Sequence, residues 1–344
     1  MKSVGSGHFW KVFASVMLAA VLFGVFLWTA PLGDVGRTLA RIKLGWVVAS
    51  VAVALGTYAL RALRWGLILR PVGRAGTANV MGCTAAGFAT STILPARAGE
   101  IVRPLLLTAR TGMPAAATLA SILTERLLDG ATVLVLFGAG VVFVGGGLNA
   151  ATLPLLRDTA LLTTLGLAAA VTLVWFLLRR REGTVRRVAS WFPARFRDRA
   201  ISFLHHLLDG LEVLRSPRRL LEIAAWSLGL WIVIGWQLVL LGKAFDLDLS
   251  LGQAFVVVAV SVIGLAVPAP AGVGGFHWAI RFGLTQLLGV EVSTSTAYAL
   301  IHHAICFFPI TVLGLAYLAV VGVSLGKVRA LETQAGAAPE GPAT

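Results

Sequence analysis

Charged residues are scarce in this sequence. Only 13% of its 344 residues are Asp, Glu, Lys or Arg, 58% are hydrophobic, and the mean hydropathy is +0.87. Soluble globular domains have about 25% charged residues. The composition therefore excludes an ordinary soluble domain and indicates an integral membrane protein.

Cysteine is nearly absent too. Cys83 and Cys306 both lie inside apolar segments, where a small core residue is expected rather than a disulfide or a metal ligand. The sequence also has no nucleotide-binding P-loop, no GxSxG elbow and no metalloprotease histidine pair. We therefore expect no catalytic site, no cofactor, no metal and no use of ATP by this chain.

Long apolar runs are abundant. A helix needs about 20 apolar residues to cross the hydrocarbon layer, and six runs are long enough. A cleaved signal peptide is an alternative for the first run, but the run is long and has no small-residue cleavage site, which favours an uncleaved helix. At the end of the second run we expect Arg61 and Arg64 to extend to the headgroups beside Trp65. The predicted spans are residues 12–30, 45–69, 114–144, 159–178, 220–242 and 297–325.

Two further apolar regions, 76–112 and 252–288, are broken by glycine and proline. Residues 76–94 are rich in small residues and end at Pro95, and the pieces 101–112 and 252–267 are short. Counting positive charge decides how they are placed. The loop 179–219 carries eleven arginines against four acidic residues, so the positive-inside rule makes it cytoplasmic. If 76–94 were a full span, this loop would lie outside; it falls inside if 76–112 enters the membrane and returns. The same treatment of 252–288 returns Lys327 and Arg329 to the cytoplasm. Both chain ends then lie in the cytoplasm.

The predicted fold class is an all-α polytopic membrane protein with about six full spans and two re-entrant helical hairpins, which enter from opposite sides as in an inverted repeat. Residues 1–330 form one membrane domain and 331–344 a disordered tail. Within the basic loop, residues 199–214 fit an amphipathic helix on the membrane surface. Net charge is +14, but its concentration in one loop indicates anionic lipid rather than nucleic acid as the partner.

Short, broken apolar segments in matching positions of two halves are typical of a transporter site. Charged residues gather beside the first break, within residues 90–130. Glu125 and Asp129 share one helix face, and Arg126 can reach Asp129. One reading is a structural ion pair, and the other is a polar chamber whose arginines bind a lipid phosphate. The charged candidates are Arg97, Glu100, Arg103, Glu125, Arg126 and Asp129.

The second break holds weaker candidates. Gly272 and Gly274 allow a tight turn and a close approach of backbone, although they could equally do no more than interrupt a helix. His277, His302 and His303 lie in apolar surroundings, where a hydrogen-bonded core histidine is the common case. Three together are consistent with a protonatable or headgroup-binding cluster.

At these residues the chain resembles the transmembrane, flippase-like region of lysylphosphatidylglycerol synthases and its stand-alone relatives. The resemblance covers nearly the whole chain. It rests on RALRWGLIL at 61–69, ILPARAGEIVRP at 93–104, TERLLDG at 124–130 and VPAPAGVGGFHWA at 267–279. The family usually has an acid at the position of His277 and an arginine at that of His303. The bifunctional synthases continue into a soluble aminoacyltransferase domain, so the resemblance implies lipid handling without lysyl transfer.

We therefore expect a bacterial inner-membrane protein that translocates or handles a phospholipid or isoprenoid-lipid headgroup, with the candidates above lining its polar chamber. An accessory subunit that scaffolds an envelope-lipid biosynthesis enzyme through the basic loop is the competing hypothesis. A third hypothesis is an intramembrane transferase acting on lipid. The driving force, the lipid and the oligomeric state stay open.

Overall fold

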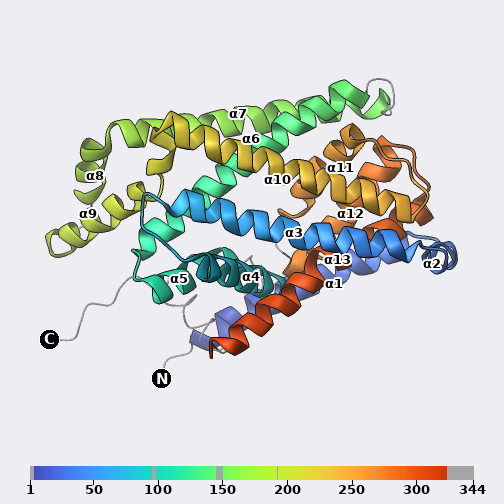
Figure 1. Cartoon of the computed structure of the whole chain (residues 1–344), viewed down its shortest axis with the longest axis horizontal. Coiled ribbons are helices and arrows are strands. Elements are labelled where there is room, and N and C mark those ends of the chain that lie inside the picture. The colour runs from blue at the N-terminus through green and yellow to red at the C-terminus, as the bar shows by residue number, and fades with distance from the viewer. Residues whose placement is uncertain (1–3, 95–97, 145–149, 192, 268, 324–344) are drawn as a thin grey trace.

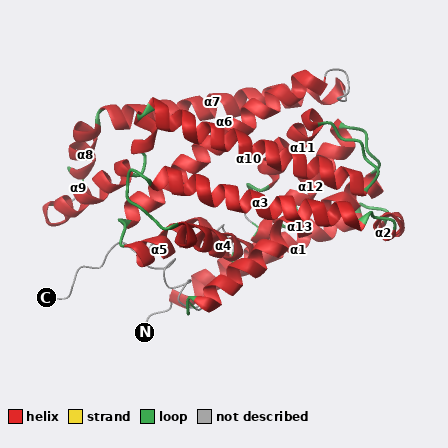
Figure 2. Ribbon diagram, viewed as in Figure 1, coloured by secondary structure: helices red, strands yellow, loops and turns green. Residues whose placement is uncertain are grey.

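The computed structural model describes residues 4–94, 98–144, 150–191, 193–267 and 269–323. Within them the chain is helical and contains no strand (Figure 2). The helices of the first half are α1 Val4–Trp28, α2 Leu32–Ala40, α3 Leu44–Leu69, α4 Thr77–Ile93, α5 Gly99–Thr111, α6 Ala115–Val144 and α7 Leu153–Arg179. Those of the second half are α8 Arg181–Ala189, α9 Ala194–Asp209, α10 Pro217–Ala244, α11 Leu251–Gly264, α12 Gly275–Phe282 and α13 Val292–Val320.

Five of these helices, α3, α6, α7, α10 and α13, are long and apolar enough to cross a membrane. α1 and α2 together form a sixth candidate, bent by 86° at the short connection between them. Their hydrophobic surfaces face outward, as in Leu162, Val142 and Val320, because lipid takes the place of water around the bundle. The predicted all-α polytopic fold with about six spans is confirmed.

The two broken regions form two helical hairpins. α4 and α5 pack together near the end of the bundle that carries α8 and α9, and α11 and α12 pack together near the opposite end (Figure 1). α11 begins at a capping box in which Ser250 and Gln253 bond to each other's backbone. Each broken region is thus a pair of short helices joined by a break in the chain, as the sequence predicts.

Glycines allow the arms of each hairpin to cross in near contact. A Cβ added to Gly99 would lie 1.7 Å from the carbonyl oxygen of Gly87, and one added to Gly275 would lie 2.4 Å from that of Gly264. Between α11 and α12 the chain turns through the 3₁₀ segment η5, Pro270–Gly272. Ala271, Gly272 and Gly274 have φ of 53°, 66° and 86°. Glycine suits such left-handed backbone because it lacks a Cβ.

The helices repeat one pattern twice. In the first half a span (α3), a hairpin (α4–α5) and a span (α6) follow one another, and α10, α11–α12 and α13 repeat that order. The contacts between halves match as well: α6 packs along α11, α13 packs along α4, and α3 packs along α10. A close backbone approach at a glycine occurs in both contacts. Gly140 of α6 lies against the backbone of Gly252 on α11, and Gly314 of α13 lies against that of Ala85 on α4. The arrangement is an inverted repeat.

The basic segment folds onto one end of the bundle. α8 and α9 lie at the end where α1 begins and α13 ends (Figure 1). Leu208 of α9 is buried against the cluster that contains Ala120 of α6, and a Cβ on Gly210 would touch the backbone of Ala117. The prediction of a helix over 199–214 lying free on the membrane is therefore wrong in part. α9 ends at Asp209, and its buried apolar side is covered by α6 and α7. The tail predicted at 331–344 lies outside the described residues.

Candidate functional site

A buried ion cluster connects the first three spans of the repeat. Arg64 on α3 is fully buried, and its Nη1 lies 2.6 Å from Oδ1 of Asp129 on α6. Its Nη2 lies 3.5 Å from Glu125, which is also fully buried, and Nη1 donates to Ser227 on α10. One guanidinium thus holds two carboxylates on one face of α6, the face predicted for Glu125 and Asp129.

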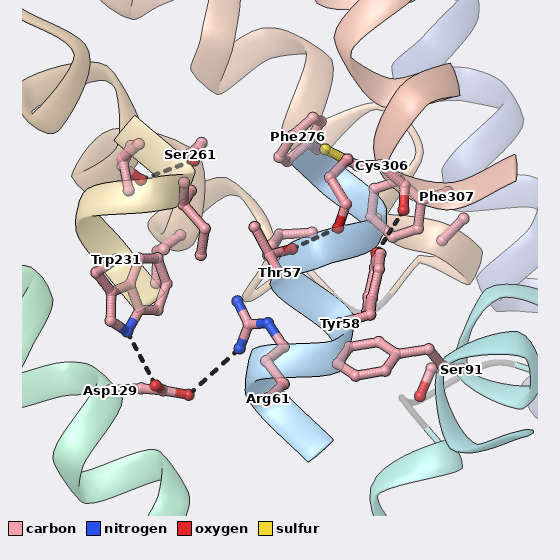
Figure 3. A pocket seen from close by; sticks show the side chains of 18 of the residues that line it. Thr57, Tyr58, Arg61, Ser91, Asp129, Trp231, Ser261, Phe276, Cys306 and Phe307 are labelled. Atoms are coloured by element: carbon pink, nitrogen blue, oxygen red, sulfur yellow. Dashed lines mark hydrogen bonds and ion pairs between the residues drawn. The ribbon is translucent and has the colours of Figure 1, made fainter. Parts of the chain in front are cut away.

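Arg61 enters the same cluster one turn earlier on α3. Its Nη1 lies 3.7 Å from Asp129, and its guanidinium lies 5.3 Å from the ring centre of Trp231. Figure 3 shows Arg61 pointing between Asp129 and Trp231, whose indole N–H donates to the Asp129 carboxylate over 2.9 Å. The expectation that Arg61 and Arg64 extend to the headgroups is wrong, because the buried carboxylates of α6 pair with both.

The first hairpin adds Glu100 and Arg103 to the cluster, and α6 adds Arg126. Arg103 on α5 is buried, its Nη1 lies 3.2 Å from Glu125, and it stacks 3.9 Å from the centre of the Trp65 ring. Arg126 lies between three acids, 3.7 Å from Glu100, 3.6 Å from Glu125 and 3.4 Å from Asp129. The predicted contact of Arg126 with Asp129 is confirmed.

The cluster carries more positive than negative charge. Four guanidinium groups face three carboxylates, a formal charge of 4 − 3 = +1 among the described residues. Within it, Nε and Nη2 of Arg103 have no hydrogen-bond partner in the described part of the chain. Removing ions from water costs several kcal/mol each, and pairing repays this only with good geometry. Fold stability alone therefore does not explain so many buried charges, and charge within a membrane span marks a functional site.

The cluster borders a cavity of about 320 Å³ between the two hairpins. Arg61, Glu100, Arg103, Arg126 and Asp129 line one part of it. Gln237, His302, Cys306 and the turn at Ala271–Gly272 line another. In Figure 3 side chains of α3, α4, α6, α10, α11 and α13 converge on this space. Both halves of the repeat thus contribute to one chamber, where transporters built from inverted repeats place their substrate.

The predicted candidates separate into four groups. Those that line the cavity are Glu100, Arg103, Arg126, Asp129 and Gly272. Glu125 lies behind the wall and holds Arg64, Arg103 and Arg126 in place. Gly274, His277 and His303 are outside the lining, and Arg97 lies outside the described residues.

The two predicted histidines form a stack behind the turn. The rings of His277 and His303 lie 4.4 Å apart with an angle of 29° between them. His303 Nε2 lies 3.0 Å from the Ala271 carbonyl oxygen, so its N–H donates to the turn. His277 packs against Phe23 and Phe26 of α1. These histidines hold the η5 turn and α1 together and do not face the cavity. Gly274 makes way for Leu22 of α1 in the same region.

Sequence reasoning missed several residues of the ion cluster and the cavity. Arg61 and Arg64 belong to the quoted segment at 61–69, so a signal was present, but an arginine near the end of a span is normally interfacial. Trp231 and Gln237 lie on α10, a span without any break. His302, one of the three histidines predicted as a cluster, does line the cavity. Single polar residues in an apolar helix give no indication of which neighbour they meet.

The described residues contain no group of three His, Cys, Asp or Glu side chains that could hold a metal ion. The arrangement instead offers guanidinium donors, which suit phosphate and carboxylate groups. The described residues thus form a helical membrane protein with a cationic chamber between two helical hairpins.

The chain belongs to the family described as the lysylphosphatidylglycerol synthase TM region, which matches residues 12–314. It is similar to the UPF0104 membrane protein of Methanothermobacter thermautotrophicus, with 24% identity over 314 residues, 86% of this chain and 88% of that protein. It is also similar to a protein named glycosyltransferase AglD of Haloferax volcanii, with 27% identity over 293 residues and 75% of this chain. That match covers only 46% of AglD, so the chain spans less than half of this relative.

Proposed function

We propose that this protein moves a lipid with an anionic headgroup across the membrane, and that the cationic cluster holds the phosphate of that headgroup inside the bilayer. The buried arginines at the cavity wall carry this proposal. Arg103 is buried at the cavity, and two of its nitrogens have no hydrogen-bond partner among the described residues. A phosphate has the charge and the acceptor oxygens to bind them. The candidate lipids are a phospholipid or an isoprenoid lipid.

The ion pairs explain how such a cluster can hold an anion and release it. Arg103 lies 3.2 Å from Glu125, and Arg126 lies 3.6 Å from Glu125 and 3.4 Å from Asp129. These carboxylates neutralise most of the positive charge, so the anion meets an excess of about one charge. Conduction needs binding that is favourable enough to admit the ligand and weak enough to free it.

Reconstitution tests the proposal. Liposomes with the purified protein and a phosphatidylglycerol labelled on one acyl chain are exposed to a membrane-impermeant reductant, which bleaches only the outer leaflet. Movement of lipid raises the bleached fraction above the outer-leaflet share. We expect this with the natural chain and not with Arg103→Gln, which keeps hydrogen bonding but removes the charge.

Arg110→Gln is the matched control, because Arg110 lies on the same helix, is exposed and bonds to Asn79. It should transport like the natural chain. Equal bleaching by Arg103→Gln and Arg110→Gln would reject the cationic cluster as the lipid site.

A second candidate is an accessory subunit that holds an envelope-lipid enzyme at the membrane. The relative named as a glycosyltransferase supports it, since more than half of that protein lies beyond the match. The exposed arginines of α8, among them Arg186 and Arg187, would contact such an enzyme. If purified protein moves none of the lipids offered, co-purification of an enzyme with the natural chain and its loss after Arg186→Glu and Arg187→Glu would favour this candidate.

Under either candidate the chain is proposed to act without catalysing a reaction itself and to lie in a bacterial inner membrane. The basic α8 and α9 then lie on the cytoplasmic side, with both chain ends, because arginine is retained there. A membrane-impermeant thiol reagent added outside intact cells tests the orientation of a cysteine placed in α8. If the reagent labels this cysteine, α8 lies outside and the proposed orientation is wrong.

A further inference from the structure

The second half of the repeat contains its own buried polar pair. Gln237 on α10 and His302 on α13 lie 3.0 Å apart, between Oε1 and Nε2. Arg64 on α3 and Asp129 on α6 form the corresponding pair of the first half. Both pairs join residues that are 65 positions apart in the sequence.

The two pairs occupy equivalent places in the repeat. α10 begins at Pro217 and α3 at Leu44, a shift of 217 − 44 = 173 residues. The same shift takes Arg64 to Gln237 and Asp129 to His302. It also takes Tyr58 to Trp231, and these two aromatic residues each donate a hydrogen bond to the other half, Tyr58 to the Cys306 carbonyl and Trp231 to Asp129. The internal repeat thus extends from the helices to individual side chains.

The equivalent positions differ in charge. The shift replaces Arg61 by Ile234, Glu125 by Tyr298 and Arg103 by Phe276. The second pair therefore lies in uncharged surroundings, with the His302 ring stacked on Phe276 and the Cys306 sulfur 3.5 Å from Nε2.

The pair lines the same cavity and has two unused hydrogen-bonding groups. Gln237 and His302 are 2% and 3% exposed, and both line the cavity. Because Gln237 Oε1 only accepts, the proton of the imidazole lies on Nε2 and leaves Nδ1 as an acceptor. Nε2 of Gln237 and Nδ1 of His302 have no partner among the described residues. Buried polar groups in proteins are almost always bonded, so each such exception calls for a ligand or a water.

α10 places this pair away from the cationic cluster. Trp231 bonds to Asp129, and Gln237 follows on the same helix. At 1.5 Å per residue the two positions are about 9 Å apart along the axis. Ile234, which lies between them on the cavity wall, is apolar. A ligand that reaches both therefore has its charge at one end and neutral polar groups at the other.

We propose that Gln237 and His302 form a neutral subsite that binds hydroxyl groups of the lipid headgroup whose phosphate the arginine cluster holds. A hydroxyl group accepts a hydrogen bond from the Gln237 amide and donates one to His302 Nδ1, which matches the two unused groups. The substrate class is then a phosphate ester that carries hydroxyls, from glycerol or from a sugar. This inference rests on the proposed function, because it assumes that the phosphate binds at Arg103.

Matched lipids test the subsite. Phosphatidylglycerol and phosphatidylmethanol have the same phosphodiester charge and differ in the two hydroxyls. A sugar phosphopolyprenol and the methyl ester of the polyprenyl phosphate, again both phosphodiesters, form the second pair. Binding to the full chain in detergent is measured by native mass spectrometry. We expect the natural chain to prefer the hydroxylated member of one pair by about 5- to 10-fold, the contribution of one or two hydrogen bonds. The preferred pair identifies glycerol or sugar as the source.

Gln237→Met keeps the length of the side chain and removes the amide, and His302→Leu removes the imidazole. Either variant, once shown to be monodisperse, should bind both members of the pair equally, with affinity for the hydroxyl-free lipid retained. Gln286→Met is the control for the amide, since Gln286 is exposed on the surface. It should keep the preference of the natural chain.

Arg103→Gln separates the two proposals. If Arg103→Gln no longer binds any of the four lipids, and Gln237→Met still binds them but without preference, both proposals are supported. If Arg103→Gln loses all lipids but neither Gln237→Met nor His302→Leu changes the preference, the neutral subsite is rejected and the phosphate site stands. A natural chain without preference in either pair also rejects the subsite. Unchanged binding by Arg103→Gln rejects the phosphate site instead.

Discussion

The two halves of the bundle share an architecture and differ in electrostatics. α3 to α6 and α10 to α13 repeat the order of span, hairpin and span, and their contacts match. The first half carries the ion cluster, whereas the equivalent positions of the second half are uncharged or histidine. A symmetrical backbone thus encloses a cavity with one charged and one neutral end. Under the proposed function, the shared scaffold serves the movement of the lipid, and the side chains of the two halves orient its headgroup.

The largest expected effect comes from breaking the charged pair. Arg64→Ala leaves Glu125 and Asp129 without their most buried partner, which should destabilise the fold by about 3–5 kcal/mol. Gln237→Ala, in the neutral half, leaves no buried charge and should cost about 1–3 kcal/mol. Unfolding in mixed micelles, followed by circular dichroism, measures both. Arg70→Ala is the control, since its pair with Glu222 is exposed and contributes less than about 1 kcal/mol. Equal losses for Arg64→Ala and Gln237→Ala would contradict the electrostatic difference between the halves.

The hairpin crossings allow the backbone symmetry to be tested. Gly99→Ala and Gly275→Ala place a Cβ 1.7 and 2.4 Å from a carbonyl oxygen of the opposite arm. Both should lose about 1–3 kcal/mol, with Gly99→Ala at the upper end, because the arms must separate. Gly138→Ala and Gly229→Ala, where no atom lies within 4 Å, should be neutral or stabilising. The same unfolding measurement applies, and a tolerated Gly99→Ala would mean that the arms do not cross closely.

Exchanging the pairs tests whether the positions are equivalent. The double variant Arg64→Gln with Asp129→His installs the second-half pair in the first half. It should be more stable than the sum of the single changes by about 1–2 kcal/mol, the coupling expected of residues in contact. It should keep its binding of anionic lipid, since one positive and one negative charge are removed together and Arg103 stays in place. A double-mutant cycle of unfolding free energies measures the coupling, and a value near zero would show that the two sites do not correspond.

The smallest effect concerns the aromatic donors that cross between halves. Trp231 donates to a carboxylate and Tyr58 to a neutral carbonyl. Bonds to charged groups are worth about 1.5–3 kcal/mol against about 0.5–1.5 for neutral pairs, so Trp231→Phe should cost about 1 kcal/mol more than Tyr58→Phe. Trp236 lies on the same helix and is exposed, so the free-energy change of Trp236→Phe gives the effect of the smaller ring alone and is subtracted. A larger loss for Tyr58→Phe would reverse the expected order.

Much of the fold could be predicted because it depends on local sequence. The lengths of the apolar runs predict the spans, and Pro and Gly beside short apolar runs predict the two hairpins. The eleven arginines of 179–219 require an even number of crossings before them. The pair of Glu125 with Asp129 on one face follows from helical spacing alone. The surface helix at 199–214 was only partly right, because its burial depends on α6, far away in the sequence.

The site could be predicted only in part. Glu100, Arg103, Arg126 and Asp129 lie beside a break and stand out by charge. Arg64 does not, since an arginine near a span end has water within reach in most membrane proteins. His277 attracts attention for its place in a glycine-rich turn, yet it packs against α1 behind that turn.

By itself the sequence determined that the chain is helical and membrane-embedded and where its helices break, because hydrocarbon requires each segment to satisfy its own backbone. Only the tertiary structure decided which polar side chains meet. Arg64 reaches Asp129, and Gln237 reaches His302, across 65 residues of chain, because neighbouring spans pack side by side. The packing of whole helices sets these distances, and no local pattern encodes them.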